Sequence, residues 1–133
     1  MASEDRPVAF VDSSAIVALV DSEDAAHTAA VAAYNELKET GYRLFTTDHV
    51  VVETYDLLLN GVGPIVAARW LRENRLPVYP TDESDLAAAQ VILFGRPDES
   101  PISLPDAISL AVMERLGVAD AFAVDPSFLA ALT

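Results

Sequence analysis

The chain has 133 residues, of which 52% are apolar, and it carries a formal net charge of −13. This length supports one well-filled hydrophobic core and is too short for two, so we expect a single domain over residues 1–133. The sequence contains no cysteine, which excludes disulfides, thiolate metal sites and a cysteine nucleophile and agrees with a reducing compartment.

Apolar runs and turn residues alternate regularly along the sequence. In chain order, the first half predicts a strand over residues 8–11, a helix from Ser13 or Ser14 to Val20, a helix over 22–40, a strand over 43–47 and a helix over 48–60. The second half predicts a helix over 64–74, a strand over 76–79, a helix from its cap Thr81 to Phe94, a loop over 95–102, a helix from its cap Ser103 to Arg115, a strand over 121–124 and a last turn from Pro126. This alternation predicts an α/β fold with a short, mostly parallel central sheet of about four to five strands, covered by helices on both faces.

The N-terminal apolar run has the wrong length and composition for a membrane segment. It covers residues 8–20 and is interrupted by Asp12, Ser13 and Ser14, so it neither spans a bilayer nor resembles a signal peptide. We expect a soluble cytoplasmic protein without membrane contact.

Three carboxylates stand where a predicted strand or loop meets a helix. Asp12 follows the first strand, and Asp125 follows the last strand and precedes a proline. Asp106 comes three residues after Ser103, which is the spacing of a capping box. Helix capping would explain each of these three acids taken alone.

Glu53 is different because it lies inside a predicted helix, where no cap is needed. At helical spacing it shares a polar face with His49, Asp56 and Asn60. The opposite, apolar face is expected to comprise Val51, Tyr55 and Leu58. Solvent exposure is the simple explanation for this polar face, and the alternative is that it lines a crevice above the strand ends.

The carboxyl ends of parallel strands meet at the crevice where open α/β sheets place their ligands. Several carboxylates gathered there repel one another, and at least one takes up a proton unless a cation is bound. Oxygen ligands suit magnesium or manganese. Only His27 and His49 remain as softer ligands, which argues against zinc.

Four segments carry these acids in a recognisable order. They read VDSSAIVAL at residues 11–19, TTDHVVVET at 46–54, ISLPDAISLAVM at 102–113, and LGVADAFAVDPSF at 116–128. Their combination resembles the PIN domains, above all the toxin ribonucleases of the VapC type, over essentially the whole chain. The resemblance implies a PIN-like three-layer fold.

The resemblance also implies roles for individual residues. It places Asp12, Glu53, Asp106 and Asp125 at the metal-binding and catalytic positions, with Ser13 and Ser103 as supporting neighbours. The chain departs from the family pattern at two positions near the last acid, with Ala123 in place of Thr or Ser and Pro126 in place of a polar residue. These departures leave open whether Asp125 binds a metal directly or acts through water.

The activity implied is hydrolysis of RNA phosphodiester bonds with Mg²⁺ or Mn²⁺ as cofactor. The implied partners are the RNA substrate, a second copy in a homodimer, and an antitoxin whose basic C-terminal segment wraps the toxin and reaches the acidic pocket. The sequence leaves open whether the chain is such a toxin or a nuclease of housekeeping RNA processing.

Two further classes can be weighed against the nuclease. A receiver-like phospho-acceptor domain also binds magnesium at strand ends, but it requires a lysine at a late strand end, and Lys38 lies within a predicted helix. A catalytically silent PIN domain would be expected to lack one of the acids, and none is missing.

The charge distribution restricts how RNA is bound. A net charge of −13 argues against tight, metal-free binding of nucleic acid. It does not argue against a nuclease whose bound cations reverse the local field. Arg69, Arg72 and Arg75 recur every third residue along a predicted helix, and a solvated helix face is the simple interpretation of that stripe.

Overall fold

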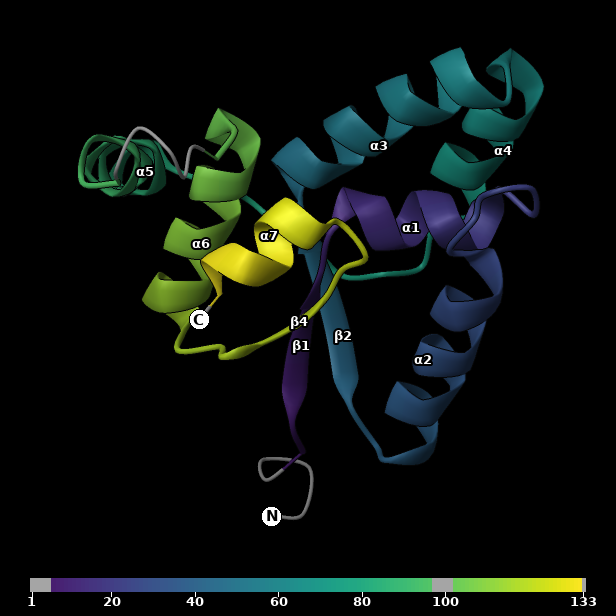
Figure 1. Cartoon of the computed structure of the whole chain (residues 1–133), viewed down its shortest axis with the longest axis horizontal. Helices are drawn as coiled ribbons and strands as arrows, with labels where there is room; N and C mark the ends of the chain where they lie inside the picture. Colours follow the sequence, from purple (N-terminus) through teal and green to yellow (C-terminus); the bar gives the residue numbers. More distant parts are fainter. Residues whose placement is uncertain (1–5, 97–101, 133) are drawn as a thin grey trace.

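The structure, a computed structural model, describes residues 6–96 and 102–132, and it is drawn in Figure 1. Its strands are β1 (Val8–Val11), β2 (Arg43–Thr47), β3 (Val78–Tyr79) and β4 (Asp120–Phe122). Its helices are α1 (Ser13–Val20), α2 (His27–Glu39), α3 (Asp48–Gly61), α4 (Pro64–Glu73), α5 (Glu83–Phe94), α6 (Leu104–Leu116) and α7 (Pro126–Ala131). None of the helices in these two ranges is long and apolar enough to cross a membrane.

The four strands form one parallel sheet in the order β3-β2-β1-β4. β1 lies in its middle, with Phe10 opposite Phe45 of β2 and Ala121 of β4. Because all strands run the same way, their carboxyl ends lie at one edge of the sheet, where α1, α3 and α7 begin (Figure 1). The predicted α/β class with a parallel central sheet is therefore confirmed.

Helices cover both faces of the sheet. In Figure 1, α1, α2 and α4 lie on one side of the strands, and α5, α6 and α7 lie on the other. The buried ring of Phe10 packs against Phe45 and Phe128, with ring centroids 5.8 Å and 6.2 Å away. Phe10 and Phe45 lie on strands that are covered on both faces, where apolar residues are expected throughout, and Phe128 of α7 packs on them from one side.

Two helix starts differ from the sequence prediction. α2 begins at His27 rather than at residue 22, because Asp21 and Asp24 accept hydrogen bonds from amides two residues later and hold turns instead. The cap of α5 is Asp82, which forms a capping box with Asp85. Thr81 was predicted as that cap, but it donates instead to Asp48.

The short strands also differ. β3 covers two residues rather than four, because proline at position 77 has no N–H to donate to the ladder. β4 ends at Phe122, two residues before the predicted end. Most of the loop predicted over 95–102 lies outside the described residues.

Candidate functional site

Asp12 connects the end of β1 to the start of α1 and is almost completely buried, with 2% of its surface exposed. Its Oδ2 accepts hydrogen bonds from the amide and the hydroxyl of Ser14, at 3.2 Å and 2.7 Å. Its Oδ1 is buried and has no hydrogen-bond partner among residues 6–96 and 102–132. A buried carboxylate oxygen left without a donor is costly, and a cation is the kind of partner that would satisfy it.

Ser14 joins Asp12 to the last segment of the chain. While its hydroxyl donates to Asp12, the same oxygen accepts hydrogen bonds from the amides of Val124 and Asp125, at 3.0 Å and 3.2 Å. Ser14 therefore fixes the loop after β4 beside Asp12. Ser13, but not Ser14, was predicted to support the site, because the amides that Ser14 binds lie 110 residues away or more along the chain.

Glu53 lies on α3 and points toward the start of α1. Its Oε1 accepts a 2.8 Å hydrogen bond from the hydroxyl of Ser13. Burial raises the pKa of Glu53, the bond from Ser13 lowers it, and the negative charges of Asp12 and Asp125 raise it further. The half-buried Glu53 thus lies in the electrostatic field of Asp12 and Asp125 and is not a solvated side chain.

The buried face of α3 was predicted one residue out of register. It comprises Val50, Thr54 and Leu58 rather than Val51, Tyr55 and Leu58. The predicted polar face is itself divided, because Asp56 and Asn60 are exposed while Glu53 and His49 are partly covered.

Asp106 lies in the first turn of α6, which Ser103 caps through its hydroxyl, 3.2 Å from the Asp106 amide. Only 8% of Asp106 is exposed. Burial raises the pKa of Asp106 to about 6, and the charges of Asp12, Asp125 and Glu53 act in the same direction, against a hydrogen bond with Ser103 that lowers it. This carboxyl group therefore titrates close to neutral pH.

Asp125 caps α7, where its Oδ1 accepts from the amide of Ser127 at 3.2 Å. It is less buried than Asp12 and Asp106, and its charge acts on both Glu53 and Asp106. The four predicted acids, which we call the acid group, are thus brought into mutual electrostatic range at the carboxyl edge of the sheet. Three of them also cap or begin helices, so these residues both cap helices, as the simple interpretation of the sequence predicts, and belong to the acid group.

The acid group has the chemistry of a site for a hard divalent cation, with oxygen ligands only and one buried oxygen that lacks a donor. As the side chains stand, no three Asp, Glu or His residues within 6–96 and 102–132 are arranged to hold a metal ion. Like charges keep carboxylates apart, so an ion that joined them would have to draw them closer together.

His49 is a second residue to which the sequence analysis gave no role of its own. It lies at the start of α3, with Nδ1 2.7 Å from the hydroxyl of Thr47 and Nε2 3.1 Å from the hydroxyl of Ser109 on α6. It therefore connects the helix that carries Glu53 to the helix that carries Asp106. Its partner on α6 is too distant in sequence to be predicted.

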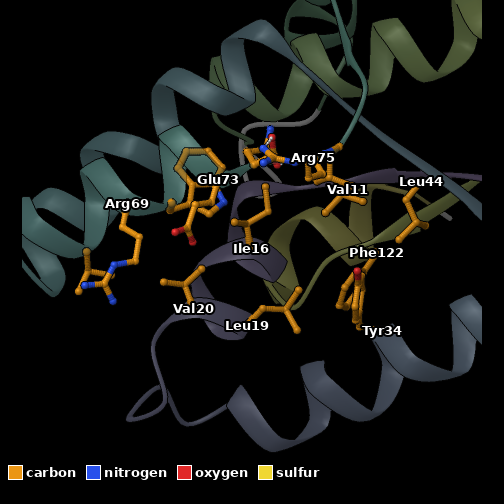
Figure 2. A pocket seen from close by; sticks show the side chains of 14 residues that line it. Val11, Ile16, Leu19, Val20, Tyr34, Leu44, Arg69, Glu73, Arg75 and Phe122 are labelled. Atoms are coloured by element: carbon orange, nitrogen blue, oxygen red, sulfur yellow. Dashed lines mark hydrogen bonds between the residues drawn. The ribbon is translucent and has the colours of Figure 1, made fainter.

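A groove of about 680 Å³ runs along the opposite side of β1, between α1, α2 and α4. Figure 2 shows Ile16, Leu19 and Val20 of α1 lying between Tyr34 and the α4 residues Arg69 and Glu73. The groove also includes Val11, the residue directly before Asp12, but none of the four acids lines it. Arg69 and Arg75, but not Arg72, line it.

Lys38 does not support a receiver-like site. It lies near the C-terminal end of α2, with its ammonium group 5.2 Å from the centre of the Tyr34 ring. That position does not place a lysine at a late strand end.

Comparisons with known proteins agree with this geometry. The PIN domain profile matches residues 9–131. Proteins named 23S rRNA-specific endonuclease VapC20, from Mycobacterium tuberculosis strains CDC 1551 / Oshkosh and H37Rv, are 33% identical over 124 residues, which is 92% of this chain and 92% of theirs. The crystal structure of M. tuberculosis VapC20, a sarcin-ricin loop cleaving toxin, superposes with a TM-score of 0.78 at 32% identity, covering 93% of this chain and 94% of that one.

Proposed function

The chain belongs to the PIN-domain family, and we propose that it is a metal-dependent endoribonuclease that acts as the toxin of a toxin-antitoxin pair. The observation that carries this proposal is the electrostatic coupling of the four acids, since Asp12, Asp125 and Glu53 all raise the pKa of Asp106. Such coupling at the carboxyl edge of a parallel sheet is typical of a site that binds cations and phosphate esters.

Asp12, Glu53, Asp106 and Asp125 would hold Mg²⁺ or Mn²⁺. When bound, the cation supplies Lewis-acid chemistry, by activating water and offsetting negative charge on the phosphate. Ser14 orients Asp12 and the Asp125 loop together through its three hydrogen bonds. Ser13 holds Oε1 of Glu53, and we assign to Oε2 the proton that leaves the attacking water.

RNA is the proposed substrate class. The VapC20 relatives are endonucleases specific for 23S rRNA, and M. tuberculosis VapC20 is a toxin that cleaves the sarcin-ricin loop. An RNA hairpin carrying that loop is therefore the first substrate to test. Recognition of such an RNA depends on its shape and on unstacked bases, and so does not require a net positive charge, which this chain of net charge −13 does not carry.

An antitoxin with a basic C-terminal segment is the proposed partner. The groove between α1, α2 and α4 is lined mostly by apolar side chains, and Val11, the residue directly before Asp12, is one of them. The apolar face of an amphipathic segment would lie in this groove, while a basic side chain at its end would extend past Val11 toward the four acids. Complementary charge of this kind accelerates association and fixes the register of binding.

We also propose a homodimer. The α5 residues Val91 and Phe94 are 73% and 84% exposed, and Val52 of α3 is 64% exposed. Exposed apolar side chains of this size are typical of surfaces that a partner covers. Light scattering on the purified protein measures the oligomeric state.

The test of the nuclease is cleavage of the loop hairpin with Mg²⁺ or Mn²⁺, with and without chelator. Asp12→Asn should abolish cleavage without loss of the fold, while Glu83→Gln, which changes an exposed acid on α5, should cleave like the wild type. Activity in chelator, or full activity of Asp12→Asn, would contradict the assignment.

The toxin role is tested separately. Cells expressing this chain alone should stop growing, and they should recover when the neighbouring gene is expressed as well. If growth is normal in both cases although the purified protein cleaves RNA, the housekeeping alternative replaces the toxin.

A further inference from the structure

The imidazole of His49 forms an oriented chain of hydrogen bonds. The hydroxyl of Ser109 lies 3.1 Å from the carbonyl of Pro105, to which it donates, and 3.1 Å from Nε2 of His49. We assign the tautomer of His49 that carries its hydrogen on Nε2, facing the Ser109 oxygen and the Pro105 carbonyl. In this tautomer Nδ1 accepts from the hydroxyl of Thr47.

The surroundings of His49 favour the neutral imidazole that these hydrogen bonds require. Burial lowers the pKa of His49, against a hydrogen bond to the Pro105 carbonyl and the charges of Asp48, Asp12 and Asp85, which raise it. A neutral imidazole has one donor and one acceptor, which is what Ser109 and Thr47 need. Both neighbours are buried, so neither can exchange its bond for water.

The two helices that His49 connects are otherwise held by different neighbours. α3 packs mostly against α1 and α4, whereas α6 packs mostly against α5. Between α3 and α6 lies a hollow of about 380 Å³, lined by Val52 and Leu57 on one side and by Leu104 and Ile108 on the other. His49 lines the same hollow and forms the hydrogen bond to Ser109 of α6.

Each end of this bridge lies about one helical turn from an acid of the site. Glu53 follows His49 by four residues on α3, and Asp106 precedes Ser109 by three residues on α6, so each pair shares a helix face. A change in the separation of the helices at the bridge therefore changes the separation of the two carboxylates.

We propose that His49 is a positioning residue that sets the distance between Glu53 and Asp106 by tying α3 to α6 through Ser109. The expected effect of His49 on metal affinity rests on the proposed function, whereas its expected effect on the distance between α3 and α6 does not. Two measurements therefore test the two parts separately.

The first measurement is the distance between the helices without metal. The chain has no cysteine, so spin labels can be attached at Leu59→Cys on α3 and Glu114→Cys on α6, both exposed. His49→Phe keeps a ring but loses both nitrogens, and Ser109→Ala is the second variant. Both should shift or broaden the distance distribution relative to wild type, and the double variant should match the single ones because all three lose the same bond.

The control is His27→Phe, which removes the other histidine, a residue that bonds to the Ala18 carbonyl away from this bridge. Its distance distribution should match the wild type. If the distributions of His49→Phe and Ser109→Ala also match the wild type, the bridge does not set the helix separation and the proposal fails.

The second measurement is Mn²⁺ affinity, from a calorimetric titration of each folded variant. His49→Phe should bind Mn²⁺ about tenfold more weakly, the scale expected when a residue that orients metal ligands is lost. His49→Gln, which retains an N–H able to reach Ser109, should recover part of the loss. Equal affinities of wild type and His49→Phe would contradict the proposal. A wild type that neither binds Mn²⁺ nor cleaves RNA would instead contradict the proposed nuclease function. In that case the distance measurement alone would decide whether His49 sets the separation of the helices.

Discussion

The hydroxyl of Ser13 donates a 2.8 Å hydrogen bond to Oε1 of Glu53, 40 residues further along the chain. The bond joins the first turn of α1 to the middle of α3. Because Asp12 directly precedes Ser13, the same turn carries one acid of the site and orients another. The charge state of Glu53 therefore depends on a residue that belongs to the first acidic motif.

Ser13→Ala should move the acid side of the pH–activity profile to higher pH. The Ser13 bond lowers the pKa of Glu53, while burial and two nearby acids raise it, so removing the bond raises that pKa. Cleavage on the acid side of the profile should fall by a factor of a few while cleavage at its alkaline end changes less. Ser22→Ala, in an exposed turn, is the control, and an unshifted profile for Ser13→Ala would show that Glu53 does not titrate in the reaction.

Asp106→Asn should stabilise the metal-free protein at neutral pH. The folded state keeps the Asp106 proton up to about pH 6, against 3.8 for the ordinary carboxyl. The stability that this group contributes is complete below about pH 4 and is lost as the pH rises to about 6. At about 1.4 kcal/mol per unit of pKa, the loss has an upper limit of about 3 kcal/mol.

Urea denaturation in chelator at several pH values measures this effect. Wild type should lose stability between about pH 4 and pH 6 more steeply than Asp106→Asn. A variant that is less stable than wild type at pH 7.5 would contradict the predicted sign.

Manganese should raise the melting temperature of the wild type more than that of Asp106→Asn. A ligand that binds only the folded state adds about 2.7 kcal/mol at a hundred times its dissociation constant. Thermal melts with and without millimolar Mn²⁺ give the two shifts. Glu83→Gln should respond like the wild type, and equal shifts for all three proteins would count against a shared site.

Phe128→Ala should cost about 3–5 kcal/mol of stability. Phe128 is completely buried, and it anchors α7 against Phe10. Because Asp125 caps the same helix, the variant should also lose activity at temperatures where it remains folded. Leu129→Ala, which removes a side chain that is 41% exposed, should have little effect on either quantity, and chemical denaturation with parallel cleavage assays compares them.

Association of the antitoxin should slow as salt rises. The chain has a net charge of −13, so a basic segment is attracted at long range, and this attraction is screened beyond about 8 Å at physiological ionic strength. Stopped-flow mixing at increasing salt measures the association rate. A rate independent of salt would indicate that the apolar groove, rather than the charge, directs the encounter.

Most of the fold follows from local sequence patterns. The buried runs that form β1 and β2 and the helix beginning at Pro64 lie where the sequence predicted them, because apolar periodicity and proline at the first turn are local signals. The start of α2 was predicted too early, because residues 22–26 were counted as helical although Asp21 and Asp24 hold turns there by accepting hydrogen bonds from amides two residues later.

The composition of the acid group was more predictable than its connections. Asp12 and Asp125 were predicted as site residues from their places at the ends of strands. Glu53 was predicted because it is a charged residue inside a helix, where no cap is needed. The contacts of Ser14 and His49 were not predictable, because each joins segments far apart in the sequence. Local spacing carries no information about such pairs.

The order of the sheet affects when the site can form during synthesis. β1 lies between β2 and β4, so the first strand to leave the ribosome cannot pair on both sides until β4 has been synthesised. The loop that Ser14 holds lies 110 residues later, and Asp125 belongs to it. A nascent chain that has not yet reached this loop lacks one of the four acids and one neighbour of the central strand, so the proposed site cannot assemble before Asp125 has left the ribosome.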